Sequence, residues 1–365
     1  MTTIKNVTDY LESIAPPFLQ ESYDNAGLIV GDASGEVTGI LIALDSLEEI
    51  VDEAVRHQCN MVVVHHPIVF KGISKINGKN YVERTVIKAI QQKVAIYAIH
   101  TNLDNVSTGV NKKICERLGL TNLKILAPKK NMLMKLVTFC PVDHAAKIRS
   151  ALFEAGCGSI GNYDECSFNV NGIGTFRASE GTTPFVGEKG KQHHETETRI
   201  ETVFASYLES KVIAALLEAH PYEEVAYDLY SLENYNQQIG SGMIGELTSE
   251  MDEMDFLKMV KSTMKTGSIR HTKLLGSKVK KVAVCGGAGS FLLNDAIKAK
   301  ADFFVTSDYK YHQFFDAENK IVIADIGHYE SEQFTSELLK ELIVRNFSTF
   351  AVRLTELVTN PVHYY

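Results

Sequence analysis

The sequence has no tryptophan, few cysteines and no long apolar run. Its six cysteines are scattered over 365 residues without a C-x-x-C pair. In a chain of this size, that pattern indicates buried, reduced thiols in a cytoplasmic protein and argues against a disulfide framework. We expect no membrane segment, because no apolar run is long enough to span a bilayer and the first residues lack the apolar core of a signal peptide.

Positive charge is also scarce. Lys and Arg number 37 against 45 Asp and Glu, so the formal net charge is -8 at pH 7. The chain therefore has no general basic surface for nucleic acid, and this class of partner is disfavoured. The remaining composition, with 45% hydrophobic and 22% charged residues, is typical of a folded globular protein. A length of 365 residues is enough for two domains.

Strands and helices alternate in the first and last parts of the chain. Short apolar runs such as 61–64 and 94–99 predict buried strands, and the amphipathic segments between such runs predict helices. The same alternation returns after residue 234. It is typical of mostly parallel sheets with helices on both faces. We therefore predict a two-lobed α/β core formed by residues 1–130 and 235–365.

The pattern changes between residues 131 and 234. The elements predicted there follow the order β-α-β-β-α-β, which is that of the ferredoxin-like unit. We therefore expect an α+β domain inserted into the core. A polar segment at 178–198 separates the second and third strands and contains His193 and His194. We expect it to be a loop in which these histidines are solvated and bind no metal.

Two adjacent histidines, His65 and His66, end the strand predicted over 61–64. Successive side chains of a strand point to opposite faces, so neighbouring imidazoles can share a site only where the chain leaves the strand. Pro67 ends strand pairing at this point. Neutral imidazole is the commonest metal ligand in proteins, so we interpret this strand exit as half of a metal site.

Two other predicted strand exits carry similar side chains. One leads into His100 and Asp104, and the other leads into His328 and Glu332, which are four residues apart and share a helical face. Ligands collect at the carboxyl ends of parallel strands, so the three segments can meet at one edge. Histidines combined with carboxylates suit zinc, iron or manganese, and the set is large enough for two ions.

Each of these features also has a structural explanation. A lone histidine more often caps a helix or fills a core, and His100 could lie behind the ligands or in a substrate pocket. The glycine run 286–290 is predicted to open a helix, where it either binds an anion or allows tight packing. A further strand exit holds Asp308, Lys310 and His312, which are suited either to proton transfer or to a polar turn with a lysine salt bridge.

Seven segments resemble the NIF-three-like family, also called the GTP cyclohydrolase 1 type 2 family. They are DNAGLIVGD, VVVHHP, HTNLDNVSTGVN, GSGMIGEL, AVCGGAGS, TSDYKYH and DIGHYESE. The resemblance covers both parts of the core in the family's order. Residues 131–234 resemble the PII/CutA-like domain of the longer bacterial members, with His220-Pro221-Tyr222-Glu223-Glu224 as its recognisable turn. One departure is Tyr23, where the family usually has tryptophan.

The resemblance implies a site for two divalent metal ions. Its ligands, mapped onto this sequence, are His65, His66, Asp104, His328 and Glu332. Glu332 is expected to bridge the ions, with His66 and Asp104 on one ion and His65 and His328 on the other. Family members are toroidal homohexamers, formed as trimers of dimers, and we expect the same assembly here.

Two functions compete, and the resemblance implies the substrate of the first. The first is a metal-dependent hydrolase that opens the imidazole ring of GTP toward a dihydropterin precursor. In that case, the candidates for substrate binding or proton transfer are His100, Asp308, Lys310 and His312. The second is a metal-binding, regulatory hexamer without enzymatic activity, whose PII-like insert senses a small molecule. Sequence features alone do not separate the two.

Overall fold

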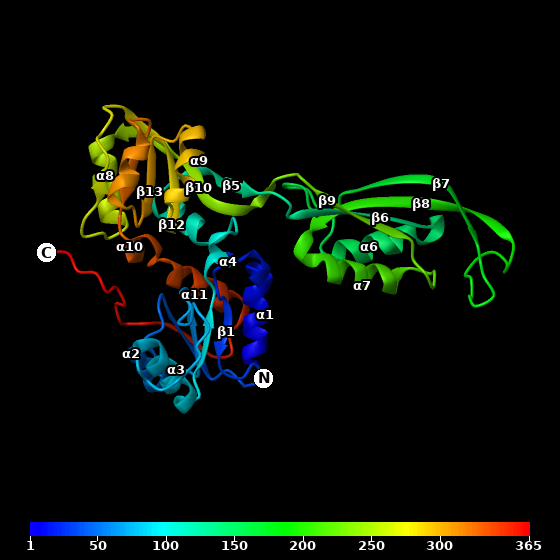
Figure 1. The fold of residues 1–365 in the computed structure, drawn as a ribbon, viewed down its shortest axis with the longest axis horizontal. Coiled ribbons are helices and arrows are strands. Elements are labelled where there is room, and N and C mark those ends of the chain that lie inside the picture. The colour runs from blue at the N-terminus through cyan, green and yellow to red at the C-terminus, as the bar shows by residue number, and fades with distance from the viewer. The chain divides into compact units, whose positions relative to one another are not determined.

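The computed structural model describes residues 1–365, which form two compact units. Unit 1 combines Met1–Pro128 with Gln238–Tyr365, and unit 2 is Lys129–Gln237. Unit 2 is thus inserted between the two halves of unit 1 (Figure 1). Each unit has a hydrophobic core of its own, so the two are described separately.

The first sheet of unit 1 has the strand order β1-β4-β3-β2-β15. All its pairs are parallel except β1 with β4. Every residue of β2, β3 and β4 is buried, which explains why these strands are continuous apolar runs. The strands are β1 Gly27–Val30, β2 Gly39–Ala43, β3 Met61–Val64, β4 Ala95–Ala98 and β15 Ala351–Leu354.

The second sheet of unit 1 has the order β11-β14-β13-β12-β10-β5. Its central strands β12, β13 and β14 are parallel, whereas β10 pairs antiparallel with β12 and β11 pairs antiparallel with β14. The expectation of mostly parallel sheets therefore holds for the first sheet, and the second is mixed. The strands are β5 Thr121–Lys129, β10 Asn236–Asp252, β11 Arg270–His271, β12 Lys278–Ala288, β13 Phe303–Ser307 and β14 Val322–Asp325.

The helices of unit 1 begin with clear local signals. Thr3 caps α1 with a reciprocal capping box to Asn6, and the Asn80 side chain accepts from the backbone N–H of Glu83 at the start of α3. Apolar residues of α2 and α3 join the core around β2 and β3. The helices are α1 Ile4–Ile14, α2 Glu48–Arg56, α3 Tyr81–Gln92, α4 Thr101–Asp104, α5 Val110–Arg117, α8 Glu253–Thr263, α9 Leu293–Lys298, α10 His328–Glu332 and α11 Thr335–Asn346.

Unit 2 is one antiparallel sheet with the order β7-β8-β6-β9 and two helices on one face (Figure 1). The predicted element order is observed. The predicted loop at 178–198 is shorter than expected, because β8 already begins at Gln192. His193 and His194 therefore pair with β7 as strand residues. The elements are β6 Leu133–Pro141, α6 Ala145–Ala155, β7 Ser167–Arg177, β8 Gln192–Ala205, α7 Glu209–Ala219 and β9 Tyr227–Leu232.

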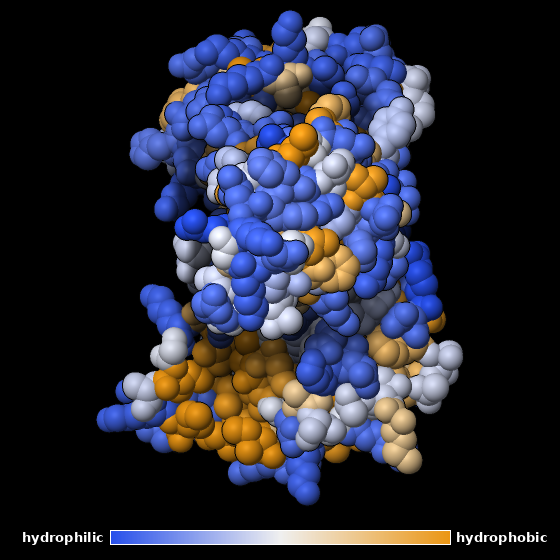
Figure 2. Space-filling view, turned by 90° about the vertical axis from the view of Figure 1, so that its right-hand side faces the viewer, coloured by the Kyte–Doolittle hydropathy of each residue, from blue (hydrophilic) through white to orange (hydrophobic).

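The surface is mostly hydrophilic on the face in Figure 2, and apolar residues gather toward its lower end, at the level where Figure 1 draws α1 to α3. No helix combines the length and the apolar content that crossing a bilayer requires. The histidines predicted to bind metal lie in unit 1, after the carboxyl ends of parallel strands of both sheets.

Candidate metal centre

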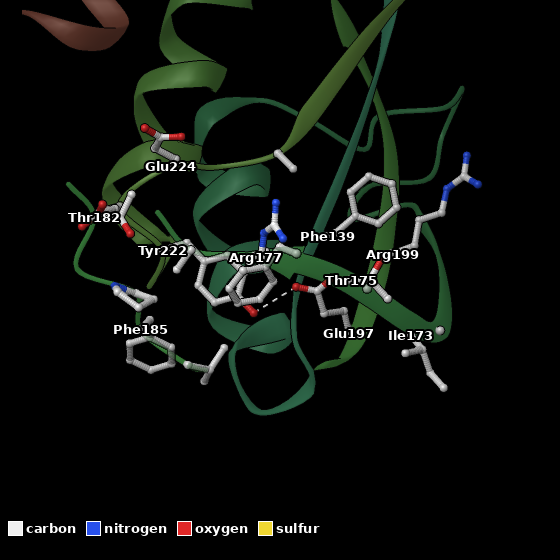
Figure 3. Close-up of a pocket in the computed structure, with 18 of the residues that line it drawn as sticks. Phe139, Ile173, Thr175, Arg177, Thr182, Phe185, Glu197, Arg199, Tyr222 and Glu224 are labelled. Atoms are coloured by element: carbon white, nitrogen blue, oxygen red, sulfur yellow. Dashed lines mark hydrogen bonds between the residues drawn. The ribbon is translucent and has the colours of Figure 1, made fainter. Parts of the chain in front are cut away.

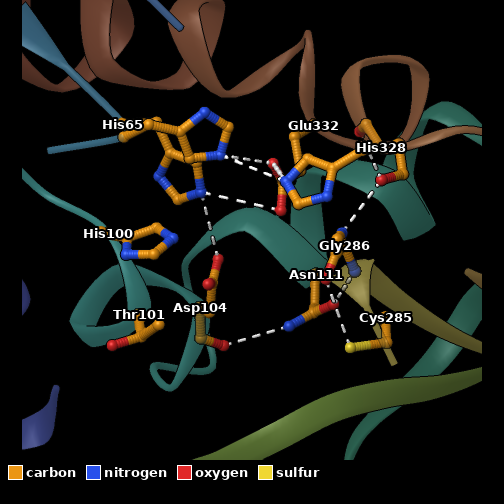
Figure 4. Close-up of polar contacts among 12 residues, drawn as sticks. His65, His100, Thr101, Asp104, Asn111, Cys285, Gly286, His328 and Glu332 are labelled. Atoms are coloured by element: carbon orange, nitrogen blue, oxygen red, sulfur yellow. Dashed lines mark hydrogen bonds and ion pairs between the residues drawn. The ribbon is translucent and has the colours of Figure 1, made fainter. Parts of the chain in front are cut away.

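Five side chains from three strand exits converge in unit 1 (Figure 4). His65 and His66 follow β3, Asp104 ends α4, and α10 begins at His328 and ends at Glu332. The carboxylate of Glu332 lies at the centre. Its Oε2 is 2.9 Å from His66 Nε2 and 3.1 Å from His328 Nε2, and its Oε1 is 3.9 Å from His65 Nε2. Asp104 Oδ1 completes the group, 3.6 Å from His65 Nε2.

All three imidazoles are oriented by a hydrogen bond from the ring nitrogen on the far side. The acceptors are Ile99 O for His65 at 2.8 Å, Asp45 Oδ1 for His66 at 2.7 Å and Asp308 Oδ2 for His328 at 2.6 Å. Carbonyl and carboxylate oxygens only accept, so each Nδ1 carries a proton. The Nε2 atoms therefore face the centre, as in metal sites whose histidines are held by outer partners.

Two buried polar atoms of this cluster have no hydrogen-bond partner. They are His65 Nε2 and Asp104 Oδ1, and His65 is fully buried. Since Nδ1 of His65 donates to a carbonyl, Nε2 presents a lone pair. Leaving such a group unsatisfied costs about 1–3 kcal/mol. A cation between the two atoms would satisfy both, so the donor set fits a divalent metal ion such as zinc, iron or manganese.

The ligand atoms fall into two groups of three. His65, Asp104 and Glu332 form one group and His66, His328 and Glu332 the other, with all atoms of a group within 4.8 Å of one another. Glu332 belongs to both, as a bridging carboxylate would. The partners of the histidines differ from the expected ones: His65 lies with Asp104, and His66 lies with His328. The physical reason is that the two neighbours leave β3 in different directions, toward Ile99 and toward Asp45 respectively.

The charges of this cluster depend on one another. Burial opposes ionisation of Glu332, but the charge of His328 and hydrogen bonds from His328 and His66 hold the pKa of its carboxyl well below the usual range. Burial likewise opposes protonation of His66, yet its bonds to Asp45 and Glu332 raise its pKa to about 9. Mainly because it is buried, Asp104 has its pKa raised to about 7. Without metal, protons thus occupy the positions that cations would take.

Gly286 and Gly287 bring β12 against the central carboxylate. A Cβ at Gly287 would lie 2.5 Å from Glu332 Oε1, and the residue has a φ of 63°. The backbone N–H of Gly287 donates to Ser331 Oγ at 3.0 Å. The run 286–290 begins as strand, because β12 continues to Ala288, and the predicted helical segment starts only at its last residue, Ser290. Close approach to Glu332 therefore accounts for these glycines, which supports the packing interpretation over the anion site.

His100 lies beside the ligand cluster. Its ring centroid is 5.2 Å from that of His65 and 5.3 Å from that of His66. Its Nδ1 hydrogen-bonds Asp24 Oδ1 at 2.7 Å. Burial opposes ionisation of Asp24, but hydrogen bonds from His100 and Thr101 lower the pKa of its carboxyl to about 2. The result is an oriented Asp–His pair at the edge of the cluster.

The other three proposed catalytic residues have different positions. Asp308 lines the cavity at the site and holds the ring of His328. Lys310 and His312 are exposed and do not line that cavity. The structure therefore brings His100 and Asp308 to the site and leaves Lys310 and His312 outside it within this chain.

The ligand cluster opens into a cavity of about 970 Å³ within unit 1. Seven carboxylates line it, against a single Lys or Arg side chain, that of Arg270. The guanidinium of Arg270 is already bonded to Asp325 and to the carbonyl oxygen of Tyr309. An anionic substrate would therefore find little positive charge in the chain itself, and metal ions would have to supply it.

The last residues of the chain form part of the cavity wall. Thr359 Oγ1 donates to Asp45 Oδ2, the other oxygen of the carboxylate that holds His66. Asn360 Nδ2 donates to Glu330 Oε1 at 3.0 Å. Thr359 is thus linked to a proposed ligand through one carboxylate.

Comparison with known proteins identifies the family. The model of Duf34/NIF3 (NGG1p interacting factor 3) matches residues 2–361, nearly the whole chain. The chain belongs to the DUF34/NIF3 family. Its relatives include a GTP cyclohydrolase 1 type 2 homolog of Halalkalibacterium halodurans, 37% identical over 98% of this chain and 96% of that protein. A Bacillus subtilis protein of the same name is 34% identical over 98% and 97%.

Solved DUF34/NIF3 structures have the same fold. The crystal structure of a Bacillus cereus protein related to NIF3 matches with a TM-score of 0.88 and 37% identity, covering 100% of this chain and 99% of that one. The resemblance deduced from the seven short segments is therefore confirmed.

Sequence reasoning missed the residues of this DUF34/NIF3 chain that support the ligands. Asp45 lies two residues after the end of the apolar strand β2, so the rule applied to the other strand exits would have found it. Asp24 gives no such signal, because it lies in a turn before β1. Thr359 is 314 residues from Asp45, and nothing in the sequence links the two.

Proposed function

We propose that this protein is a dinuclear metal-dependent hydrolase that acts on carbon–nitrogen bonds, with GTP as the first candidate substrate. The observation that carries the proposal is the convergence of three imidazole Nε2 atoms, each already fixed through Nδ1, on the buried carboxylate of Glu332. In metal sites, hydrogen-bond partners of the second ring nitrogen commonly fix the tautomer and the orientation of each histidine ligand in this way. The ligands are His65, His66, Asp104, His328 and Glu332.

The chain's residues have separable roles in this proposal. Bound divalent ions would supply Lewis-acid polarisation and a water of lowered pKa. Asp45 and Asp308 orient His66 and His328. His100, fixed by Asp24, is placed at the cavity to exchange a proton with substrate through Nε2. Lys310 and His312 do not line the cavity, and their role in substrate binding or proton transfer stays a proposal.

The choice of GTP rests on the names of the relatives, which are called GTP cyclohydrolase 1 type 2 homologs. The acidic cavity adds a condition: a triphosphate would bind only after metal ions have offset the carboxylates. We therefore expect no GTP binding by the metal-free protein.

Three further features belong to the proposal. We propose a toroidal homohexamer, a trimer of dimers, in the cytoplasm, with a PII/CutA-like insert. All six cysteines are free in the structure, which agrees with a reducing compartment.

The test combines metal content with GTP turnover. Protein purified without added metal would be compared with His66→Ala and with the control His194→Ala, an exposed histidine of unit 2. We expect two ions per chain and GTP turnover in the wild type and in the control, and loss of both in His66→Ala. Two ions without turnover of GTP would reject this substrate and favour the metal-binding, regulatory alternative. An unchanged metal content in His66→Ala would reject the site.

A further inference from the structure

Unit 2 contains a second cavity, made entirely from its own residues, with a volume of about 660 Å³. The cavity lies between β7, the middle of β8, Phe139 of β6, the loop after β7 and the turn before β9. Its volume is within the range of small-molecule sites, which is roughly 300–1,000 Å³. We propose that this cavity binds a small planar aromatic molecule that carries one anionic group.

The aromatic part of the proposal rests on a group of three rings. Tyr222 lies between Phe176 and Phe185, with ring centroids 6.4 Å and 6.1 Å from its own. All three rings line the cavity, and Phe185 is 53% exposed although it is strongly apolar. Such rings offer a flat surface that pairs with another ring at favourable offset or edge geometry.

The anionic part rests on Arg177. Its guanidinium makes no ion pair within the chain, and Figure 3 shows it directed into the middle of the lining residues. Arg199 differs, because it pairs with Glu201 at 2.9 Å and lies at the edge of the group. A guanidinium without an ion-pair partner in a cavity wall favours a carboxylate or phosphate, to which it can donate two parallel hydrogen bonds.

None of the three glutamates that line the cavity forms an ion pair with Arg177. Glu197 accepts a hydrogen bond from the Tyr222 hydroxyl at 2.9 Å, which directs its carboxylate toward that ring. Glu223 accepts the backbone N–H of Thr183 at 3.0 Å and 3.1 Å through its two oxygens. Glu224 lies at the opposite edge of the group in Figure 3. The positive charge of Arg177 is therefore available to a ligand.

Gly172 provides a way to close the cavity without disturbing the unit. It lies in β7 and lines the cavity, and a Cβ built on it meets no other atom within 4 Å. Its φ is outside the left-handed region, so a side chain causes no backbone strain. Valine favours strands. Gly172→Val should therefore fold normally and occupy the space of the ligand.

The test compares 2-naphthoate with its neutral counterpart 2-naphthamide, titrated by calorimetry into the full-length protein. We expect 2-naphthoate to bind at least about tenfold more tightly, since a charged hydrogen-bonded pair contributes about 1.5–3 kcal/mol. Arg177→Gln should remove this preference and leave 2-naphthamide binding unchanged. Gly172→Val should weaken both ligands at least tenfold. Arg149→Gln, at a half-buried arginine of α6 that does not line the cavity, is the matched control and should behave as wild type.

Other outcomes overturn the proposal. Equal binding of the two compounds, or no binding of either, would do so. The same holds if 2-naphthylmethylammonium binds more tightly than 2-naphthoate, because the glutamates would then determine the ligand. Binding that neither Arg177→Gln nor Gly172→Val changes would place the carboxylate elsewhere, for example at the metal centre. Circular dichroism of both variants would verify that unit 2 is folded.

Discussion

The two cavities of this protein differ in how many of their polar side chains have hydrogen-bond or ion-pair partners within the chain. Around Glu332 in unit 1, each imidazole has an outer partner, and the atoms left unsatisfied are buried and point at one another. In unit 2, the unpaired group is Arg177, an exposed cation that lines the same cavity as three aromatic rings. The first arrangement demands a small cation with strict geometry, and the second tolerates a range of anions. Buried preorganisation indicates a resident group, whereas an open, half-paired site indicates a ligand that comes and goes.

Removing the central carboxylate should have the largest effect and should separate the two cavities. Glu332→Gln keeps the size of the side chain but removes the charge that both ligand groups share. We expect metal affinity to fall by more than the roughly 10–100-fold that follows loss of an outer partner. Chelator competition would measure it, and 2-naphthoate binding to unit 2 should not change. Retention of two tightly bound ions would contradict the proposed bridge.

The metal-free protein should lose stability as pH rises, and this loss should come from the metal centre of unit 1 and not from the cavity of unit 2. The pKa of His66 is raised to about 9 from an ordinary value near 6.5, because bonds to Asp45 and Glu332 outweigh burial. A raised pKa stabilises the fold fully below pH 6.5, and this contribution is lost as pH rises through 9. We expect a fall of several degrees in Tm between these values. Metal-loaded protein should show a smaller fall, because metal replaces the proton; equal slopes would argue against ligation by His66.

Much of unit 1's site follows from one rule about strand exits. The sequence predicts that the segments after three strands lie together, and the structure has them side by side around Glu332. Which histidine faces which partner could not be predicted, because it depends on the exact direction in which the chain leaves β3. The role of Gly287 was also missed, since its close contact with Glu332 joins segments 45 residues apart in sequence that only the fold brings together.

In unit 2, the fold could be predicted from the sequence but the cavity could not. Its element order was readable from alternating apolar patterns, and the structure has that order. The first part of its longest strand was not readable, because this part of β8, which includes His193 and His194, is polar on both faces and has the pattern of a loop. The cavity beside it had no sequence signal, since its rings come from β7, a loop and a turn.

Weakening an outer partner in unit 1 should have an intermediate effect. Asp45→Asn keeps an acceptor for His66 Nδ1 but removes the negative charge, so the ring becomes a poorer ligand. We expect metal affinity to fall by roughly 10–100-fold with the stoichiometry unchanged at saturation. The control is Asp52→Asn, an exposed carboxylate of α2 that pairs with Lys88. An unchanged affinity in Asp45→Asn would mean that the position of His66 is fixed without this carboxylate.

The smallest effect is expected at Thr359, and it distinguishes two roles of the last segment. Thr359→Val removes the hydroxyl that donates to Asp45 but preserves shape. Metal affinity should fall by roughly 3–10-fold, within the range that follows from losing a typical net hydrogen-bond contribution of about 0.5–1.5 kcal/mol, because the hydroxyl acts on His66 only through Asp45. Thr355→Val provides the comparison, because Thr355 ties the same segment to Glu53, away from the cavity. If only Thr359→Val lowers affinity, the hydroxyl acts on His66 through Asp45. If both variants lower it equally, the segment acts merely as a tether, and the chain from Thr359 to His66 has no special role.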